Sequence, residues 1–371
     1  MKHVIYLQPH FTISWWAWNY VLETAKRIAK EPWYKVHIVS WKQDKKIIWW
    51  YDNINFEEVD MPISSSFSFW LLFPFWTVKV IKRVKHIIRN NEWEFIIFAH
   101  VFPANWWWWI FKKFNKKYKL VFMCHEPSAF IWEKKWINAI PSKSKRIIAK
   151  IINPLFRVID KYLIKKSDVI LANSKFTAER TKKIYWWCDG IAYPWYDETI
   201  FKVDPKIKKE KYFLTVWRHT KFKRFDFIIK VFSEFYKKHP DYKLKIVGKW
   251  EETENLKKLV DELKIQEWVE FLWPISLEEL VKSYQKAQAT LFASIDEPFG
   301  MVPIESMACG TIAVWHDSGG MKETIPEEYR YNEEKQLLSL TKKIEQKENP
   351  LNNNIKNFTW NESIKNIILF F

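Results

Sequence analysis

The chain has 371 residues, of which 48% are hydrophobic and 28% are charged, so it is too apolar for a disordered protein and long enough for roughly two to three domains. Its 60 basic residues exceed its 43 acidic ones, which gives a formal net charge of +17. The 3 cysteines are odd in number and widely spaced, which excludes a disulfide framework or a cysteine metal site and favours a reducing compartment.

The first half of the chain predicts a parallel α/β unit, because short apolar strands alternate with helical segments. The expected elements are a strand at 2–7, a turn at 14–19, a helix at 20–30, and strands at 35–39, 95–98, 120–123 and 169–171. No signal peptide is expected, because the apolar run after Met1 soon becomes polar. The most apolar stretch, 67–81, contains Pro74 and Lys79 and predicts no membrane span.

Positive charge is concentrated in the first half. Residues 1–200 carry a net charge of +15, whereas residues 201–371 carry +2. The segment 134–166 mixes basic and aliphatic residues at helical spacing, which predicts a basic amphipathic helix. Such a helix can lie on an anionic membrane surface or pack on a core, and both interpretations stay open. A solvated, lysine-rich surface is the plainer explanation of the charge.

A linker is predicted after Pro194, where the chain becomes polar and rich in lysine through Lys211. The α/β pattern then starts again. The expected elements are strands at 212–216, 242–247, 269–272, 289–293 and 312–314, and helices at 225–238, 254–263, 277–285 and 301–309. The predicted architecture is therefore two successive α/β units with ligand sites at the carboxyl ends of their strands.

The strongest chemical signal lies in the segment 296–310. Its carboxylates Glu297 and Glu305 are eight residues apart, one in a loop after a strand and one in the helix that follows. Gly300 lets the backbone approach a ligand closely, so that the free amides at the start of the helix can bind an anion. Alone, the two carboxylates would also fit a solvated loop and a helix surface.

The spacing of Glu297 and Glu305 resembles the E-x7-E signature of the retaining glycosyltransferases of family 4, which have the GT-B fold. Further motifs of that family follow in its order: Y-P-W-Y-D at 193–197, V-W-R-H-T-K-F-K-R-F-D at 216–226, V-G-K-W at 247–250, F-L-W at 271–273 and G-G-M-K-E at 319–323. The resemblance implies two Rossmann-like α/β domains that face each other across a cleft, with the last helix crossing back to the first domain. The implied divisions are an acceptor-side domain at 1–205, a donor-nucleotide domain at 206–352 and the returning helix at 353–371.

The same resemblance implies transfer of a sugar, with retention, from a nucleotide-diphosphate donor to a glycan or lipid-linked acceptor in cell-envelope polysaccharide or glycoconjugate synthesis. The run Lys223-Arg224-Phe225-Asp226 resembles mannosyl-transferring members, which favours mannose and GDP-mannose over a UDP-sugar. No metal and no cofactor besides the donor substrate is implied. The expected location is cytoplasmic, with a peripheral contact between the basic first domain and the inner face of the plasma membrane.

Roles for single residues are carried over from the family motifs. Glu297 would be the carboxylate beside the donor sugar, and Glu305 would accept hydrogen bonds from the ribose hydroxyls. Arg218 and Lys223 would bind the diphosphate. His125 follows an apolar strand and resembles the family's first-domain histidine that faces the donor sugar; a structural role is the alternative. The remaining donor-binding positions are Gly300, Met301, Val302, Trp15 and Trp16.

The chain has 25 tryptophans and 6 glycines, although glycine usually supplies about 7% of residues. Several tryptophans stand where the family motifs have glycine: Trp15, Trp16, Trp195, Trp217, Trp250, Trp273 and Trp315. Trp33 similarly matches a glycine that ends a helix. An indole at Trp15 or Trp16 would fill the loop after the first strand, whose backbone amides are expected to approach the donor phosphates. We therefore hypothesise that the gene reads UGA as glycine and that many of these residues are glycine in the native protein. Trp360 matches a family tryptophan and is expected to be genuine.

Two other functions remain open. A basic, aromatic-rich protein could stack single-stranded nucleic acid, and its binding would depend on salt. A nucleotide-sugar epimerase with the GT-B fold is the second alternative, although the Arg218 and Lys223 pair and the Glu297 and Glu305 pair fit a transferase better. For the transferase, no nucleic-acid partner is expected.

Overall fold

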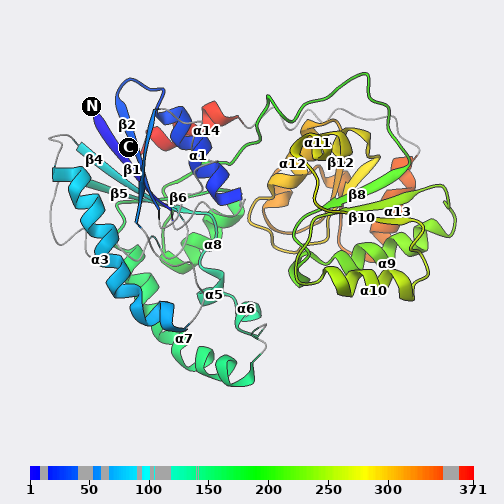
Figure 1. The fold of residues 1–371 in the computed structure, drawn as a ribbon, viewed down its shortest axis with the longest axis horizontal. Helices are drawn as coiled ribbons and strands as arrows, with labels where there is room; N and C mark the ends of the chain where they lie inside the picture. Colours follow the sequence, from blue (N-terminus) through cyan, green and yellow to red (C-terminus); the bar gives the residue numbers. More distant parts are fainter. Residues whose placement is uncertain are drawn as a thin grey trace. The chain divides into compact units, whose positions relative to one another are not determined.

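The computed structural model describes residues 1–8, 16–40, 53–59, 67–89, 94–100, 104, 118–138, 140, 142–345 and 359–371 (Figure 1). Its contacts divide the chain into two compact units, Met1–Pro194 with Trp360–Phe371, and Trp195–Thr359. The sequence placed the divisions at residues 205 and 352. The first contact boundary, after Pro194, falls earlier because part of the lysine-rich segment packs on the second unit, where Phe201 is buried. The second, after Thr359, falls later.

Unit 1 is built on one parallel sheet of seven strands. Its elements in chain order are β1 (Lys2–Gln8), α1 (Trp16–Ile28), β2 (Tyr34–Ser40), β3 (Ile54–Glu58), α3 (Phe67–Arg89), β4 (Glu94–His100), β5 (Tyr118–Cys124), α5 (Ala129–Trp132), α6 (Lys134–Asn138), α7 (Lys143–Ile164), β6 (Val169–Ala172), α8 (Lys175–Tyr185), β7 (Gly190–Ile191) and α14 (Trp360–Ile368). The strand order is β3-β2-β1-β4-β5-β6-β7. The central strands are almost wholly buried, as expected for a parallel sheet covered by helices on both faces.

The last helix, α14, belongs to unit 1, as the GT-B resemblance implied. Its first residue, Trp360, is buried, and its ring lies 5.7 Å from that of Tyr20 on α1. Beyond the helix, the carbonyl oxygen of Phe371 accepts a hydrogen bond of 3.0 Å from the Lys2 ammonium group. The two ends of the described chain therefore meet on the same unit.

Unit 2 has a parallel sheet of six strands. Its elements are β8 (Tyr212–Val216), η2 (Lys221–Lys223), α9 (Phe225–Tyr236), β9 (Lys243–Val247), α10 (Thr253–Glu262), β10 (Val269–Leu272), α11 (Leu277–Lys286), β11 (Ala289–Leu291), α12 (Met301–Ala308), β12 (Ile312–His316), η3 (Gly319–Glu323), η4 (Glu327–Tyr329), β13 (Arg330–Tyr331) and α13 (Glu334–Glu345). The strand order is β10-β9-β8-β11-β12-β13.

Each sheet reverses its winding next to its first strand. In unit 2 the reversal lies between β8 and β11, and in unit 1 it lies between β1 and β4. Loops that leave the carboxyl ends of two such strands diverge to opposite faces of the sheet, and ligands bind in the crevice between them. This topology places the functional site of unit 2 after β8 and β11.

Several details differ from the sequence-based expectation. The segment 134–166, expected as one amphipathic helix, forms two helices, α6 and α7. Helix α1 begins at Trp16, so part of the expected turn at 14–19 is helical. Strand β3 and helix α3 were not predicted, and the apolar stretch 67–81 forms the first part of α3. Within the described ranges, no helix has the length and apolar character needed to cross a membrane.

Candidate active site

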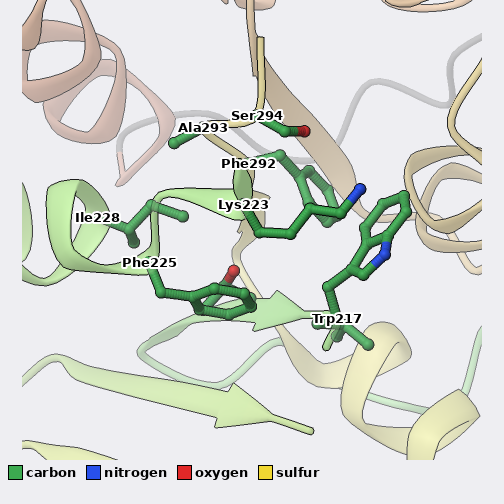
Figure 2. Close-up of a pocket in the computed structure, with 9 residues that line it drawn as sticks. Trp217, Lys223, Phe225, Ile228, Phe292, Ala293 and Ser294 are labelled. Carbon is green, nitrogen blue, oxygen red and sulfur yellow. The ribbon is translucent and has the colours of Figure 1, made fainter. Parts of the chain in front are cut away.

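A small pocket opens in unit 2 at the carboxyl ends of β8 and β11 (Figure 2). Its walls come from the end of β8, the start of α9 and the loop after β11; they are Thr215, Val216, Trp217, Lys223, Phe225, Ile228, Phe292, Ala293 and Ser294. Figure 2 shows the Lys223 side chain extending past the Trp217 ring, and its ammonium group lies 3.5 Å from the ring centroid. The pocket therefore occupies the position that the sheet topology assigns to a ligand.

Two predicted site residues are joined by an ion pair. The Lys223 ammonium group donates a hydrogen bond of 2.7 Å to Glu297, and the two side chains are only 14% and 17% exposed. Arg218 adds a second cation. Burial lowers the pKa of Arg218, and the charge of Glu297 opposes that change. The structure thus gathers a guanidinium, an ammonium and a carboxylate in one electrostatic cluster after β8 and β11.

The loop that carries Glu297 is held by Ser318 and by the first turn of η3. The amide of Gly320 donates a hydrogen bond of 2.8 Å to the Glu297 carbonyl oxygen, and the Asp296 amide donates one of 3.0 Å to the Ser318 hydroxyl. A Cβ atom at Gly320 would clash with the Pro298 carbonyl oxygen. The G-G-M-K-E motif therefore positions the Glu297 loop by close backbone approach.

Gly300 begins helix α12 with a left-handed backbone conformation, φ +78°. That conformation suits glycine, and it turns the chain from the Glu297 loop into the first helical turn. Met301 and Val302 are partly exposed in that turn. The first amides of a helix have no partner inside the helix, and its dipole is positive there, so this end of α12 can bind an anion.

Glu305 lies one turn further along α12. Burial raises its pKa to about 7, and a hydrogen bond of 3.4 Å from the Tyr284 hydroxyl opposes that rise. Tyr284 itself is fully buried on α11. Glu305 is therefore poised to change its charge near neutral pH, which the sequence did not indicate.

In unit 1, His125 directly follows β5 and is only 2% exposed. Its Nε2 atom lies 3.2 Å from Nδ1 of His100, the last residue of β4, and the Tyr20 ring packs edge-on at 4.9 Å. Burial lowers the pKa of His125 to about 3, so the imidazole is neutral at physiological pH. It can hold or donate a hydrogen bond there, but it does not supply a positive charge.

The structure brings together Arg218, Lys223, Glu297 and the start of α12, and it places Glu305 on the same helix. His125 belongs to the other unit. Trp15 lies outside the described residues, and so does the side chain of Trp16, whose backbone begins α1. In the ranges that can be described, no group of three or more His, Cys, Asp or Glu side chains could hold a metal ion.

Two residues of this site were missed as functional candidates. Tyr284 sits in an ordinary helical pattern and carries no motif, so only the folded contact with Glu305 identifies it. Gly320 was recognised as part of a family motif, but its contact with the Glu297 loop depends on two segments about twenty residues apart in the chain. The glycine pair in the G-G-M-K-E motif was the signal in the sequence that could have indicated this close backbone contact.

The tryptophans at expected glycine positions have varied surroundings. Trp315 is fully buried and donates a hydrogen bond of 2.9 Å to the Ser294 carbonyl oxygen, whereas Trp250 and Trp273 are exposed. Among the tryptophans that the structure describes, only Trp186 has a positive φ, +76°, at the end of α8. That left-handed helix end is a position where glycine is common.

Solved structures that share this fold over the full chain are GT-B glycosyltransferases. Sucrose-phosphate synthase from Thermosynechococcus elongatus aligns with a TM-score of 0.78 and 16% identity, over 100% of this chain and 98% of that one. The Anabaena protein HepE, solved in complex with UDP, aligns with a TM-score of 0.70 and 15% identity, over 100% and 97%. These likenesses define the class of fold as GT-B, as the sequence motifs implied.

Sequence comparison gives the family. The model described as Glycosyltransferase Family 4 matches residues 17–188, and the model described as Glycosyl transferases group 1 matches residues 197–358. The chain therefore belongs to the family 4 glycosyltransferases and is an enzyme of the glycosyl-transfer class. This confirms the resemblance drawn from the motifs.

Two curated relatives illustrate the range of similarity. The O-antigen chain mannosyltransferase RfbU of Salmonella typhimurium is 36% identical over 148 residues, which cover 38% of this chain and 40% of RfbU. The human GDP-Man:Man(3)GlcNAc(2)-PP-Dol alpha-1,2-mannosyltransferase is 29% identical over 176 residues, which cover 43% of this chain and 36% of that protein. The matched segments span less than half the length of these relatives.

Proposed function

We propose that this glycosyltransferase moves mannose, with retention, from GDP-mannose to a glycan or lipid-linked acceptor in the synthesis of cell-envelope polysaccharide or glycoconjugate. The observation that carries the proposal is the cluster of Arg218, Lys223 and Glu297 beside the start of α12, at the switch point of the unit 2 sheet. A cluster of this kind can bind a diphosphate and a sugar next to each other.

In the proposed step, the bond between the anomeric carbon and the β-phosphate oxygen breaks, and its electron pair stays on the diphosphate. The acceptor hydroxyl oxygen bonds to the anomeric carbon from the same face, and its proton passes to the departing phosphate oxygen. Negative charge grows on the diphosphate during this step, so fixed positive charge lowers the barrier most. Arg218, Lys223 and the amides of Met301 and Val302 supply that charge without a metal or a further cofactor.

The two carboxylates have different proposed tasks. Glu297 is proposed to lie beside the sugar ring of the donor. Its ion pair with Lys223 and the hydrogen bond from the Gly320 amide to its carbonyl oxygen, which hold the side chain and the loop in place, support this task. Glu305 accepts hydrogen bonds from the ribose hydroxyls, and this task requires its ionised form. His125 is proposed to contact the donor sugar from unit 1 as a neutral imidazole.

Mannose and GDP are favoured by the run Lys223-Arg224-Phe225-Asp226 and by the names of two relatives, RfbU, a mannosyltransferase, and the human enzyme, whose name specifies GDP-Man. The basic character of the first 200 residues favours an acceptor that carries phosphate or a lipid anchor. We infer that the enzyme works in the cytoplasm, in peripheral contact with the inner face of the plasma membrane.

A screen of the purified protein with GDP-mannose and several UDP-sugars tests this function. We expect donor turnover with GDP-mannose, and NMR of the product should show the anomeric configuration of the donor. Replacement of Arg218 or Lys223 by Gln should lower kcat/KM by about 10²–10³-fold, because each removes a fixed cation from the transition state.

Lys208→Gln serves as the matched control, since it removes a basic residue from an exposed position of the same unit. It should leave kcat/KM unchanged. Turnover of a UDP-sugar alone would overturn the choice of donor. Conversion of the donor to an epimer without transfer would identify an epimerase instead, and absence of both binding and turnover with every sugar nucleotide would contradict the proposed function.

A further inference from the structure

Helix α7 is anchored to unit 1 by one of its faces. Leu163 and Ile164 are buried in the core cluster. Asp160 is also buried, and its carboxylate accepts a hydrogen bond of 2.7 Å from the Tyr185 hydroxyl. Asn153 donates a hydrogen bond of 3.0 Å to the Ile131 carbonyl oxygen. These contacts fix which side of α7 faces the protein.

The opposite face of α7 is apolar and exposed. Successive large apolar residues recur there at alternating spacings of three and four, which places them in one stripe along the helix. They are Ile148 (53% exposed), Ile151 (71%), Leu155 (62%), Val158 (65%) and Tyr162 (56%). A continuous exposed stripe of this kind marks an interaction surface rather than an ordinary protein surface. We call it the outer stripe of α7.

Basic residues run along one flank of the outer stripe. Lys143 and Lys150 are two turns apart and exposed. Arg157 and Lys161 continue the row, but they are only partly exposed and their charged groups lie over the Trp132 ring. The only carboxylate between residues 143 and 166 is Asp160, and it faces the protein interior. The exposed surface of the helix is therefore apolar along its centre and cationic along its edge.

This combination fits an anionic membrane better than a second copy of the chain. In a twofold dimer through the outer stripe, the same patch would meet itself, and α7 offers no exposed acidic residue to pair with the basic flank of the other copy. With the two helices antiparallel, the rows of basic residues would also lie on the same side and repel each other. At a lipid surface, the apolar side chains enter the boundary of the acyl region while the basic ones contact phosphate headgroups.

We propose that the outer stripe of α7 and its basic flank dock unit 1 on an anionic lipid bilayer. Ile151 and Leu155 lie near the centre of the stripe and enter the acyl boundary, and Lys143 and Lys150 contact the headgroup phosphates. The purpose of this docking, to bring the enzyme to a lipid-linked acceptor, rests on the proposed function. The docking itself depends on α7 alone.

Sedimentation of the full-length protein with vesicles tests the docking. We expect binding to vesicles of phosphatidylglycerol and phosphatidylcholine, weaker binding as salt is raised, and little binding to phosphatidylcholine alone. Replacement of both Lys143 and Lys150 by Gln should weaken binding about 25-fold, because each basic residue near an anionic surface contributes about fivefold. Replacement of both Ile151 and Leu155 by Gln should weaken it at least tenfold.

The controls remove the same residue types elsewhere. Leu277→Gln with Leu369→Gln removes two exposed apolar residues outside α7, and Lys206→Gln with Lys208→Gln removes two exposed basic ones. Both control pairs should bind vesicles as the unaltered protein does. All variants should melt within a few degrees of it, since the altered side chains are exposed.

Three results would overturn the docking: α7 variants that still bind vesicles fully, equal binding to neutral vesicles, or a dimer that the α7 variants dissociate while vesicle binding is unchanged. Turnover of sugar nucleotide without vesicles is measured on the same samples. Loss of vesicle binding with turnover intact identifies a failure of docking alone. Vesicle binding with no turnover of any sugar nucleotide identifies a failure of the proposed function alone.

Discussion

The Lys223 ammonium group lies 2.7 Å from a carboxylate oxygen of Glu297, and each side chain is less than a fifth exposed. One residue follows β8 and the other follows β11, the two strands that flank the switch point of unit 2. The ion pair therefore ties together the two loops that form the proposed donor-binding surface. Removing only one partner of such a largely buried ion pair destabilises the fold, because the remaining charge is left without its counter-ion.

We expect Lys223→Gln to lower the free energy of unfolding by about 2 kcal/mol, because it leaves the Glu297 carboxylate largely buried without its nearest cation. Replacing both residues by Gln should recover more than half of that loss. Chemical denaturation measures both values. Lys221→Gln is the control, since that side chain is 79% exposed, and it should change stability by less than about 0.5 kcal/mol. Equal stability of the Lys223 and Lys221 variants would contradict the prediction.

Glu305 should make stability and donor binding depend on pH in opposite ways. Its pKa rises from 4.5 in the unfolded chain to about 7 in the folded protein, so the folded state holds more protons between these values. The free energy of unfolding therefore falls as pH rises from 4.5 to 7. Binding to ribose hydroxyls needs the carboxylate, so donor affinity should increase over the same range.

Thermal melts and donor titrations at several pH values measure the two trends. Glu305→Gln should remove its contribution to both and weaken donor binding at pH 8. Tyr284→Phe removes the hydroxyl that stabilises the carboxylate and should shift the midpoint of donor binding to higher pH. A midpoint that stays in place in the Tyr284 variant would show that this hydrogen bond does not control Glu305.

Gly320→Ala should weaken donor binding through the backbone. The added Cβ would meet the Pro298 carbonyl oxygen, so the Glu297 loop must move away. We expect a loss of about 1–3 kcal/mol in stability and a clear rise in the donor KM. Gly190→Ala is the matched control in unit 1, where the new Cβ would meet the side chain of Phe370. It should affect stability without changing the donor KM.

We propose that Trp186 is one of the residues that are glycine in the native protein, because its φ of +76° lies in the left-handed region. Trp186→Gly should stabilise the chain by about 1 kcal/mol, since side chains other than glycine are strained there. Trp33→Gly is the control for backbone strain, because Trp33 is also expected to be glycine but is 71% exposed and has no positive φ. It should give no such gain in a thermal melt.

Peptide mass spectrometry of the native protein tests the coding hypothesis itself. Glycine is expected at positions 186 and 217. Tryptophan at position 217, where the family motif has glycine, would contradict it.

Much of this fold could be predicted from the sequence, because buried parallel strands appear as short apolar runs. The strands around 2–7, 120–123 and 212–216 were located within one or two residues. Strand β3 was missed because Ile-Asn-Phe-Glu-Glu is polar and sits at the edge of its sheet, where burial is incomplete. The paired carboxylates and cations were recognised from their order along the chain.

The contacts made by those residues could not be predicted in the same way. The Lys223 to Glu297 pair joins residues 74 positions apart, and the Tyr284 to Glu305 contact joins two helices. Both depend on how β8, α11 and α12 pack, which periodicity does not specify. The pKa of Glu305 was likewise unforeseen, because burial of one face of a short helix depends on its neighbours.

The return of α14 to unit 1 also constrains how the protein is made. On the ribosome, residues 1–194 emerge first, but the helix that packs on α1 and covers Tyr20 is synthesised only after the whole of unit 2. Unit 2 is continuous in sequence and can fold as it emerges. Until α14 is made, the surface of α1 that it covers stays exposed and unit 1 cannot complete its packing. Unit 1, although most of it is translated before unit 2, is therefore the later of the two units to complete its fold.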